Sequence, residues 1–320
     1  MKILVVGAGV IGSFNAARLK ESGQDVKLLA RGRRLEQLRE HGVVLEDSQT
    51  GRRTATQVPV VDQLGPGDEY DLVLVAVRCD QVSSVLPVLA ENRRTPSVLF
   101  LGNHPGSIEE MAQALGRERV LMGLGNAGGY REGHVVRYVW SRRLTMPFGE
   151  LDNTVKPRTE AIAQMFRSAG LPVRVVKNVD AYLWTHAAGL PAFAGALFMA
   201  GGSISRLSQR TELLKLSLQG YREALRALRA NGVPLRPAAT RLVEWIPLPI
   251  LVFCARLFCK TKAAVVGGER PVIAAPQEMK QLADEFRAIL RRAGFPSPAS
   301  DALFAEVDAR ASANAFPRAR

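Results

Sequence analysis

The sequence predicts an α/β domain with a doubly wound parallel sheet, followed by a second, all-α domain. Three observations support this class. Apolar runs alternate with helical patterns up to about residue 150, a glycine-rich turn joins the first run to the first helix, and helical patterns dominate from residue 178 onward. A length of 320 residues suits two domains. We place the domains at residues 1–175 and 176–320.

The first domain is expected to consist of strand–helix units in regular alternation. The run at 70–78 is apolar on both faces, as is typical of a central parallel strand. Ser107, with Glu110 three residues later, predicts a capping box at a helix start. The predicted strands are 2–8, 25–31, 70–78, 97–103 and 120–129, and the predicted helices are 11–23, 34–42, 81–92, 107–116 and 155–170.

The second domain is expected to be helical. A stripe of leucines between Leu213 and Leu228 has helical spacing. The predicted helices are 178–200, 205–231, 237–259 and 276–293, and residues 313–320 are expected to fray.

One apolar stretch, 245–259, needs separate treatment. Arg256 interrupts it, and it is shorter than the roughly 20 residues that a membrane span needs. We expect a buried helix or an interface element here, with peripheral membrane contact as an alternative and no membrane span.

Composition narrows the functional classes. The net charge is +13, but the arginines are dispersed in short clusters, so a solvated basic surface is favoured over nucleic-acid binding. The three cysteines form no CxxC motif and the four histidines have no ligand spacing, which argues against a disulfide framework or a metal site. Free thiols and the lack of a secretory signal indicate a cytoplasmic protein.

The opening motif predicts a dinucleotide site. Gly7, Gly9 and Gly12 stand directly after a strand and directly before a helix. In such a unit the first glycine permits the tight turn, the second lets a pyrophosphate approach the backbone, and the third lets helix and strand pack closely. The N–H groups of the helix N-terminus then face the phosphates. The first domain is therefore predicted to have the Rossmann fold.

The end of the second strand indicates which dinucleotide is bound. An NAD site usually has Asp or Glu there, to bond the ribose 2′-hydroxyl. This strand ends in Leu29, Ala30 and Arg31, and Arg33 and Arg34 follow. Guanidinium groups suit a 2′-phosphate, so NADP(H) is favoured over NAD(H). At least one of Arg33 and Arg34 could instead be part of a solvated helix start.

These features together resemble the ketopantoate reductase family. The resemblance rests on five stretches, residues 2–13, 28–43, 70–81, 101–111 and 178–190. It implies an N-terminal Rossmann domain, a C-terminal helical domain, and reduction of a 2-keto acid by NADPH in the cleft between them.

The resemblance also assigns cofactor contacts. Arg31 matches the 2′-phosphate contact, Arg78 stands where the family usually has Lys, Gln81 also matches, and Asn103 matches the Asn near the nicotinamide, which makes it a candidate for the catalytic site as well. The phosphate turn comprises Gly7, Gly9, Val10, Ile11 and Gly12.

The catalytic half departs from the family pattern. Aligned on Trp184, the family's catalytic Lys falls at His186, and two expected Asn residues fall at Leu190 and Ala194. Near the C-terminus the family has a Ser and a Thr-Glu-Ile-Asp stretch that hold the substrate and a Glu. In the corresponding residues 270–282 of this sequence, the carboxylate is that of Glu278. Histidine is a competent general acid near neutral pH, so His186 is our candidate proton donor, with a packed helix residue as the alternative.

Three further residues are candidates for substrate contact. They are His104 beside Asn103, Asn126 after the fifth strand, and Tyr182 one turn before His186. The stretch 190–203 is rich in Leu, Phe, Ala and Met, so we expect a less polar substrate than ketopantoate.

The sequence thus predicts an NADPH-dependent oxidoreductase that reduces a keto or imine group of a small molecule. Two alternatives stay open: a non-catalytic NADP(H)-binding or sensor protein derived from this family, and a true 2-dehydropantoate 2-reductase. Surplus apolar surface at 245–259 makes a homodimer possible.

Overall fold

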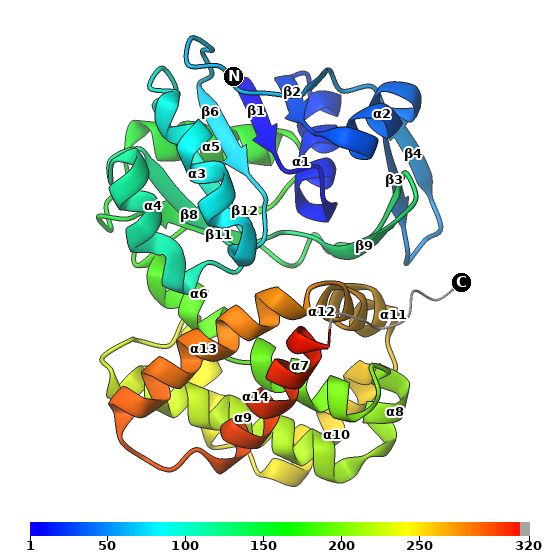
Figure 1. The fold of residues 1–320 in the computed structure, drawn as a ribbon, viewed down its shortest axis with the longest axis vertical. Helices are drawn as coiled ribbons and strands as arrows, with labels where there is room; N and C mark the ends of the chain where they lie inside the picture. The colour runs from blue at the N-terminus through cyan, green and yellow to red at the C-terminus, as the bar shows by residue number, and fades with distance from the viewer. Residues whose placement is uncertain (314–320) are drawn as a thin grey trace. The chain divides into compact units, whose positions relative to one another are not determined.

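The chain folds into two compact units, Met1–Asp180 and Ala181–Arg320. Figure 1 shows them in a computed structural model that describes residues 1–313. The fraying expected for residues 313–320 falls, apart from Ala313, outside the described residues. An α/β unit followed by a helical unit confirms the predicted fold class.

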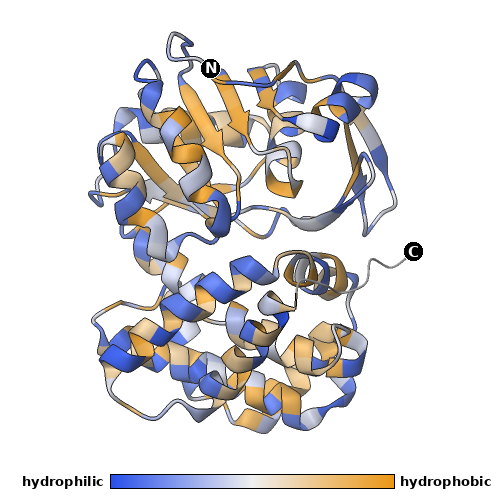
Figure 2. Cartoon of the chain, viewed as in Figure 1, coloured by the Kyte–Doolittle hydropathy of each residue, from blue (hydrophilic) through white to orange (hydrophobic). Residues whose placement is uncertain are grey.

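The first unit is built on an eight-stranded sheet in the order β12-β11-β8-β7-β6-β1-β2-β5. Neighbouring strands are parallel, except that β11 runs antiparallel to β8. Strands β1 and β6 in the middle of the sheet are largely orange in Figure 2, as expected for a sheet covered on both faces. Their bounds are β1 Lys2–Val6, β2 Asp25–Leu29, β5 Val60–Val61, β6 Leu72–Val75, β7 Val98–Leu101, β8 Val120–Gly123, β11 Met146–Glu150 and β12 Val173–Val175.

The predicted helices of this unit are present, with one correction at a helix start. Ser107 ends a short 3₁₀ turn, η2 Pro105–Ser107, and its side chain makes no capping hydrogen bond. The predicted capping box is therefore wrong, because the 3₁₀ turn already leads into the helix. The helices are α1 Val10–Glu21, α2 Gly32–His41, α3 Val82–Glu91, preceded by η1 Cys79–Gln81, then α4 Ile108–Leu115 and α5 Pro157–Ser168.

A second, four-stranded sheet was not predicted. Its order is β4-β3-β10-β9, with β3 Val43–Asp47, β4 Arg53–Thr56, β9 Gly128–Glu132 and β10 Val135–Val139. The predicted strand 120–129 is wrong as one element, because it is divided between β8 and β9. The sheet packs on α1, where the rings of Phe14 and Tyr138 lie 5.0 Å apart. It thereby buries the face of α1 that the large sheet leaves uncovered.

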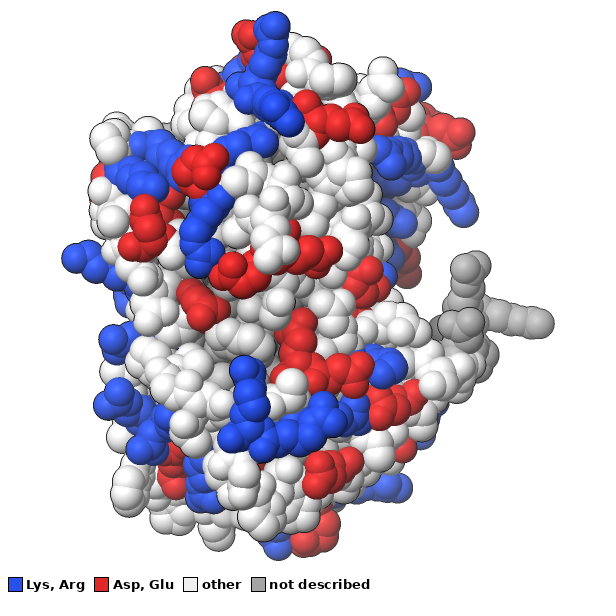
Figure 3. Space-filling view, turned by 60° about the vertical axis from the view of Figure 1, so that its left-hand side comes forward, with Lys and Arg blue, Asp and Glu red and all other residues white. Residues whose placement is uncertain are grey.

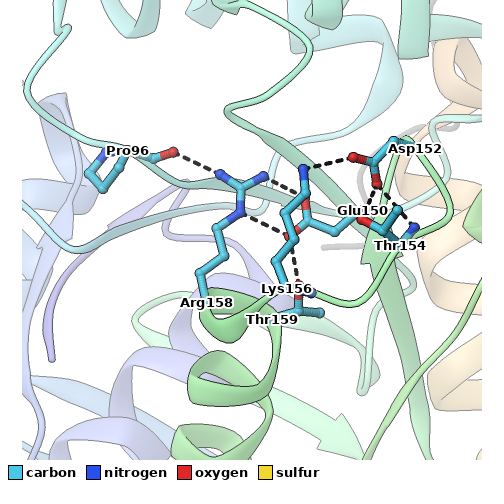
Figure 4. A network of polar contacts seen from close by, with 7 residues as sticks. All are labelled: Pro96, Glu150, Asp152, Thr154, Lys156, Arg158 and Thr159. Carbon is cyan, nitrogen blue, oxygen red and sulfur yellow. Dashed lines mark hydrogen bonds and ion pairs between the residues drawn. The ribbon is translucent and has the colours of Figure 1, made fainter.

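A polar cluster joins the end of β11 to the start of α5 (Figure 4). The Glu150 carboxylate is buried and accepts hydrogen bonds from Arg158, at 2.8 Å from Nε, and from Thr159, at 2.6 Å. Arg158 also donates to the carbonyl of Pro96, just before β7. Burial opposes ionisation of Glu150, but these hydrogen bonds outweigh it and lower the carboxyl pKa. The cluster therefore depends on an ionised carboxylate.

The second unit contains more and shorter helices than predicted. Each of the first three predicted helices is divided, two at a Gly or Pro, as at Gly189 and Pro247. Helix α14, Pro298–Ser312, was not predicted. The others are α6 Val179–Ala187, α7 Leu190–Met199, α8 Ile204–Gln209, α9 Thr211–Ala230, η3 Ala238–Glu244, α10 Leu248–Cys259, α11 Lys262–Ala264, η4 Val265–Glu269, α12 Arg270–Ala274 and α13 Pro276–Ala293.

The charges on the surface and the length of the helices bear on nucleic-acid and membrane binding. On the face shown in Figure 3, Lys and Arg side chains are interspersed with Asp and Glu. Within residues 1–313, no single helix is long and apolar enough to cross a membrane. One bent pair, η3 and α10, which meet at 117°, passes that test of length and composition when taken together.

Candidate cofactor and active site

The candidate cofactor residues gather at one edge of the large sheet. Strand β1 lies between β2 and β6, and the pairs Val6–Leu29 and Val6–Val75 put the carboxyl ends of these strands level with one another. Strand β7 follows beside β6 in the same direction. The chain leaves β1 towards β2 on one side, while β6 lies on the other, so β1 and β6 flank a topological switch point. Open α/β sheets bind their ligands there.

The three glycines of the opening turn meet three different surroundings. Gly7 has a φ of +101°, and a Cβ there would lie 2.5 Å from the carbonyl oxygen of Ala76. A Cβ on Gly12 would lie 1.8 Å from the carbonyl oxygen of Gly7, so only glycine lets α1 begin so close to β1. A Cβ on Gly9 would meet no atom within 4 Å. Gly9 therefore borders open space, where a pyrophosphate could approach the backbone.

The start of α1 offers backbone donors to that space. The first hydrogen bond of the helix runs from the amide of Ser13 to the carbonyl of Gly9. The amides of Val10, Ile11 and Gly12 precede it and have no acceptor within the helix. No acidic residue stands in the first turn. The helix N-terminus is thus suited to an anion.

Arg34 holds the glycine turn from within the domain. Its side chain is only 8% exposed and donates to the carbonyls of Ala8 (3.2 Å) and His134 (3.0 Å) and to the hydroxyl of Ser13 (3.2 Å). Burial, with a contribution from the neighbouring Arg131, lowers its pKa to about 10, so the guanidinium stays charged at neutral pH. Arg34 is therefore neither part of a solvated helix start nor presented to a 2′-phosphate.

The exposed cations after β2 are Arg31 and Arg33. Arg31 is the N-cap residue of α2, and both side chains are exposed. Arg31 donates to the carbonyl of Asp62 in a long contact of 3.4 Å. No carboxylate stands in the first turn of α2. A phosphate placed here would meet two guanidinium groups and a helix N-terminus.

The residues after β6 and β7 border the same edge of the sheet. Arg78 follows β6 and forms a two-point ion pair with Asp80, at 3.0 and 3.1 Å. Gln81 is exposed at the end of η1, and Asn103 is half-buried after β7. The fold thus brings Arg78, Gln81 and Asn103 to the edge that holds the glycine turn.

His104 lies inside the domain. Its ring is fully buried, and neither nitrogen has a hydrogen-bond partner within the described chain. Burial lowers its pKa to about 4, and the nearby carbonyls of Leu101 and Val77, which lie outside good hydrogen-bond geometry, offset only part of this. A Cβ on Gly102 would lie 2.6 Å from the ring Nε2, so the ring folds back over its own strand end. The structure therefore gives His104 a packing position, not the ligand-facing position that we expected.

The side chain of Asn126 is hydrogen-bonded to that of Asn15. Its amide and that of Asn15 on α1 donate to each other, both at 3.0 Å, and Asn15 also donates to the carbonyl of Ile11. A Cβ on the preceding Gly125 would lie 2.6 Å from Cδ1 of Ile11. Asn126 thus fastens its loop to the phosphate-facing end of α1, and the predicted substrate contact would require breaking this pair.

His186 is exposed in the last turn of α6. Surrounding protein atoms lower its pKa by desolvation. Tyr182, one turn earlier, is half-buried. Both residues begin the second unit and have surface available to a ligand.

The remaining candidates of the second unit are largely enclosed. Glu278, in the first turn of α13, is buried. Ala194 is also buried, and a Cβ on Gly195 would lie 2.3 Å from the carbonyl oxygen of Leu303. Helix α7 is therefore a core helix, which accounts for most of the apolar composition of 190–203. Its half-buried residues are Leu190, Phe193 and Met199.

Sequence reasoning missed Ser13 and Asn15. Both are fully buried polar residues of α1 and bond into the phosphate turn, through Arg34 and Asn126 respectively. Their signal was present, because polar side chains on an otherwise apolar helix directly after the glycine motif require partners. No group of three or more His, Cys, Asp or Glu side chains within residues 1–313 is placed to hold a metal ion.

Comparison with known proteins places this chain among oxidoreductases. Residues 3–153 match the family described as ketopantoate reductase PanE/ApbA. The uncharacterized oxidoreductase YkpB of Bacillus subtilis (strain 168) is 28% identical over 250 residues, which cover 74% of this chain and 78% of that protein. A 2-dehydropantoate 2-reductase of Pyrococcus horikoshii is 25% identical over 240 residues, covering 73% and 75%.

Solved structures share the fold over nearly the whole chain. A 2-dehydropantoate 2-reductase from Geobacter metallireducens GS-15 has a TM-score of 0.78 at 22% identity, covering 97% of this chain and 99% of that one. A D-mandelate dehydrogenase with NADH and anilino(oxo)acetate has a TM-score of 0.78 at 18% identity, covering 98% and 99%. At these identities the likeness shows the fold alone.

Proposed function

The chain belongs to the ketopantoate reductase family through residues 3–153, as a divergent member, and from this we propose an NADPH-dependent oxidoreductase that reduces a keto or imine group of a small molecule. In this proposal residues 1–175 bind the cofactor, and residues 176–320 bind substrate and carry any self-association. The protein acts in the cytoplasm, which agrees with its three free cysteines.

The observation that carries this proposal is the open space at Gly9 beside the start of α1. The amides of Val10, Ile11 and Gly12 would hold the pyrophosphate. Arg31 and Arg33 would hold the 2′-phosphate, since both are exposed at the end of β2. The geometry favours NADP(H) because the positions that would bind a ribose hydroxyl carry cations.

The remaining roles follow from position and chemistry. The reduced nicotinamide supplies the hydride when the cofactor is bound. Asn103, after β7, orients the reacting end of the cofactor and the substrate carbonyl. His186 donates the proton to the substrate oxygen, since its exposed ring can exchange protons with water. Arg78, Gln81, Tyr182 and Glu278 are assigned as supporting contacts.

Cofactor preference is tested by calorimetry. Wild-type protein should bind NADPH at least about tenfold more tightly than NADH, because charge-assisted hydrogen bonds to the 2′-phosphate are lost with NADH. The double variant Arg31→Gln/Arg33→Gln should remove this preference. Arg39→Gln, an exposed arginine at the other end of α2, serves as the control and should leave it unchanged. Equal binding of both nucleotides by wild type would contradict the NADP(H) assignment.

The substrate is proposed to be less polar than ketopantoate, because Leu190 stands where the family has Asn and retains accessible surface. NADPH oxidation should be followed with ketopantoate, with aliphatic and phenyl-substituted 2-oxo acids, and with imines. Faster turnover of the apolar compounds supports the proposal. Preferential turnover of ketopantoate would identify a true 2-dehydropantoate 2-reductase.

The role of His186 separates an enzyme from a cofactor sensor. His186→Ala should lower kcat by about 100-fold or more, the usual contribution of a general acid, without changing NADPH affinity. Arg226→Ala, at an exposed position of α9, is the control and should leave kcat unchanged. Tight NADPH binding without turnover of any compound in the panel would favour the non-catalytic alternative, which the loss of the family's Lys motivates.

A further inference from the structure

Helix α10 presents an apolar face to solvent. Ile250, Phe253, Cys254, Leu257 and Phe258 are exposed, and their spacing of 3, 4, 7 and 8 residues places them on one side of the helix. The buried residues Val252 and Cys259 lie on the opposite side. Phe253 is 61% exposed. Trp245, at the C-terminal end of η3, is 79% exposed. We call the five residues of α10 the α10 face.

The helix is held firmly although only part of it is buried. Arg222 of α9 donates to the carbonyls of Val243 (2.9 Å) and Ile246, just before α10. Arg256, within α10, donates to the carbonyl of Ser208 (3.1 Å) and the hydroxyl of Thr211 (2.7 Å). Polar contacts therefore fix the inner side of α10 and leave its apolar side outward. In Figure 2 the helix is largely in the hydrophobic colour.

The charges of the segment that contains this face are almost all positive. Residues 238–264 contain four cations, Arg241, Arg256, Lys260 and Lys262, and one acidic residue, Glu244. Glu244 is paired with Arg229 of α9. Arg241, Lys260 and Lys262 are exposed. Lys260 and Lys262 thus lie just beyond the C-terminal end of the α10 face. Arg241 lies in η3, which precedes its N-terminal end.

A second copy of the chain suits this surface poorly. A two-fold interface brings the same patch of both copies together. An antiparallel pair of α10 helices would place Lys260 and Lys262 of one copy beside the positive N-terminal end of the other helix, and a parallel pair would place them beside each other. Segment 238–264 supplies no unpaired carboxylate to compensate. The net charge of +13 adds to the repulsion.

We propose that the α10 face docks the protein on the surface of an anionic phospholipid bilayer. A helix with Phe and Leu on its outer side and basic residues at its border lies in the plane of the lipid–water interface, held by apolar burial and by attraction to anionic lipid. Tryptophan is favoured at that depth, as at Trp245. The attachment is peripheral, and the inner side of α10 stays packed on the protein.

The test is cosedimentation of the full-length protein with vesicles. Binding should be strong to vesicles of phosphatidylcholine with 30% phosphatidylglycerol, weak to pure phosphatidylcholine, and reduced when NaCl is raised from 50 to 500 mM. Leu257→Glu should weaken binding about tenfold or more. The matched control is Leu144→Glu, because Leu144 is an exposed leucine (71%) of the first unit. It should bind as wild type.

Cys254 allows a second measurement, since it is exposed while Cys79 and Cys259 are buried. A polarity-sensitive fluorophore on Cys254 should shift to shorter wavelength on anionic vesicles. An unchanged spectrum, or equal loss of binding in Leu257→Glu and Leu144→Glu, would overturn the proposal. So would a salt-resistant dimer, measured by light scattering, that Leu257→Glu dissociates and that does not bind vesicles, because the face would then be covered by a second copy.

Discussion

Arg34 shows how one residue can support a binding site without touching the ligand. It joins the carbonyl of Ala8, the hydroxyl of Ser13 and the carbonyl of His134, which belong to three different segments. Two of these groups lie in or directly after the glycine turn. The planar guanidinium reaches all three at once, which the single ammonium of a lysine cannot do in the same geometry. We therefore assign Arg34 as a positioning residue for the phosphate turn.

Replacing Arg34 tests this assignment. Arg34→Met should lower the free energy of unfolding by about 2–3 kcal/mol, because buried acceptors lose a charged donor. It should also weaken NADPH binding about tenfold. Arg34→Lys should restore much of the stability but less of the affinity, as measured by chemical denaturation and calorimetry on the folded variants. Wild-type affinity in Arg34→Met would show that the turn needs no such support.

His104 makes a separate, pH-dependent contribution. Its pKa is lowered to about 4 in the folded protein, from an ordinary value of 6.5. The unfolded chain therefore binds more protons between these two values, and stability falls as pH is lowered from 6.5 towards 4. Above pH 6.5 this contribution is fully present. The lowering of the pKa from 6.5 to about 4 corresponds to about 3 kcal/mol of unfolding free energy.

Substitution of His104 should flatten that dependence. In His104→Gln and in His104→Met, the loss of unfolding free energy between pH 6.5 and 4 should be smaller than in wild type by up to about 3 kcal/mol. Denaturation curves at several pH values provide the measurement. Curves that stay parallel to those of wild type would show that the ring is charged in the folded protein.

At the scale of elements, the sheet edge and the Glu150 cluster have different functions. At the carboxyl edge of the large sheet, hydrogen-bond donors remain exposed for a ligand. In the Glu150 cluster the donors are bonded to protein acceptors, and these bonds join β11, α5 and the segment before β7. Thr159 and Arg158 both satisfy the same carboxylate in Figure 4. The cluster is therefore a structural joint.

Glu150→Gln should destabilise the protein at pH 7 by about 2–4 kcal/mol, since it leaves Arg158 without its buried anion. The lowered pKa of Glu150 means that its stabilisation is present above about pH 4.5 and is lost as pH falls through the lower folded-state value. The variant should accordingly lose less stability on acidification than wild type. Glu212→Gln, in an exposed pair with Lys215, is the control and should behave as wild type in thermal melts at both pH values.

At the scale of the whole molecule, the candidate cofactor residues and a contiguous core lie in the first unit. The core cluster that covers α1 extends from Ile3 to Val175, with no member from the helical unit. We expect a fragment of residues 1–180 to fold and to bind NADPH within about threefold of the full-length affinity, because its binding groups are complete. Circular dichroism establishes folding, and calorimetry measures the affinity. A folded fragment without affinity would show that the second unit completes the cofactor site.

Some features could be predicted from the sequence because they depend on local rules. The alternation of strands and helices follows from side-chain periodicity, and the turn at Gly7, Gly9 and Gly12 follows from backbone freedom and close approach. The absence of a carboxylate after Leu29 is likewise visible in the chain itself. These local features determined the fold class and the expected kind of cofactor.

Other features were decided by contacts between distant segments. The second sheet pairs β3 with β10, about 90 residues apart, and no local pattern specifies that pairing. The burial of Arg34 and His104, the pairing of Asn126 with Asn15, the core position of α7 and the outward face of α10 are of the same kind. A local pattern tells which side chains are apolar or charged, but whether each meets solvent, ligand or protein depends on which remote surfaces fold against it, and that is a property of the tertiary structure.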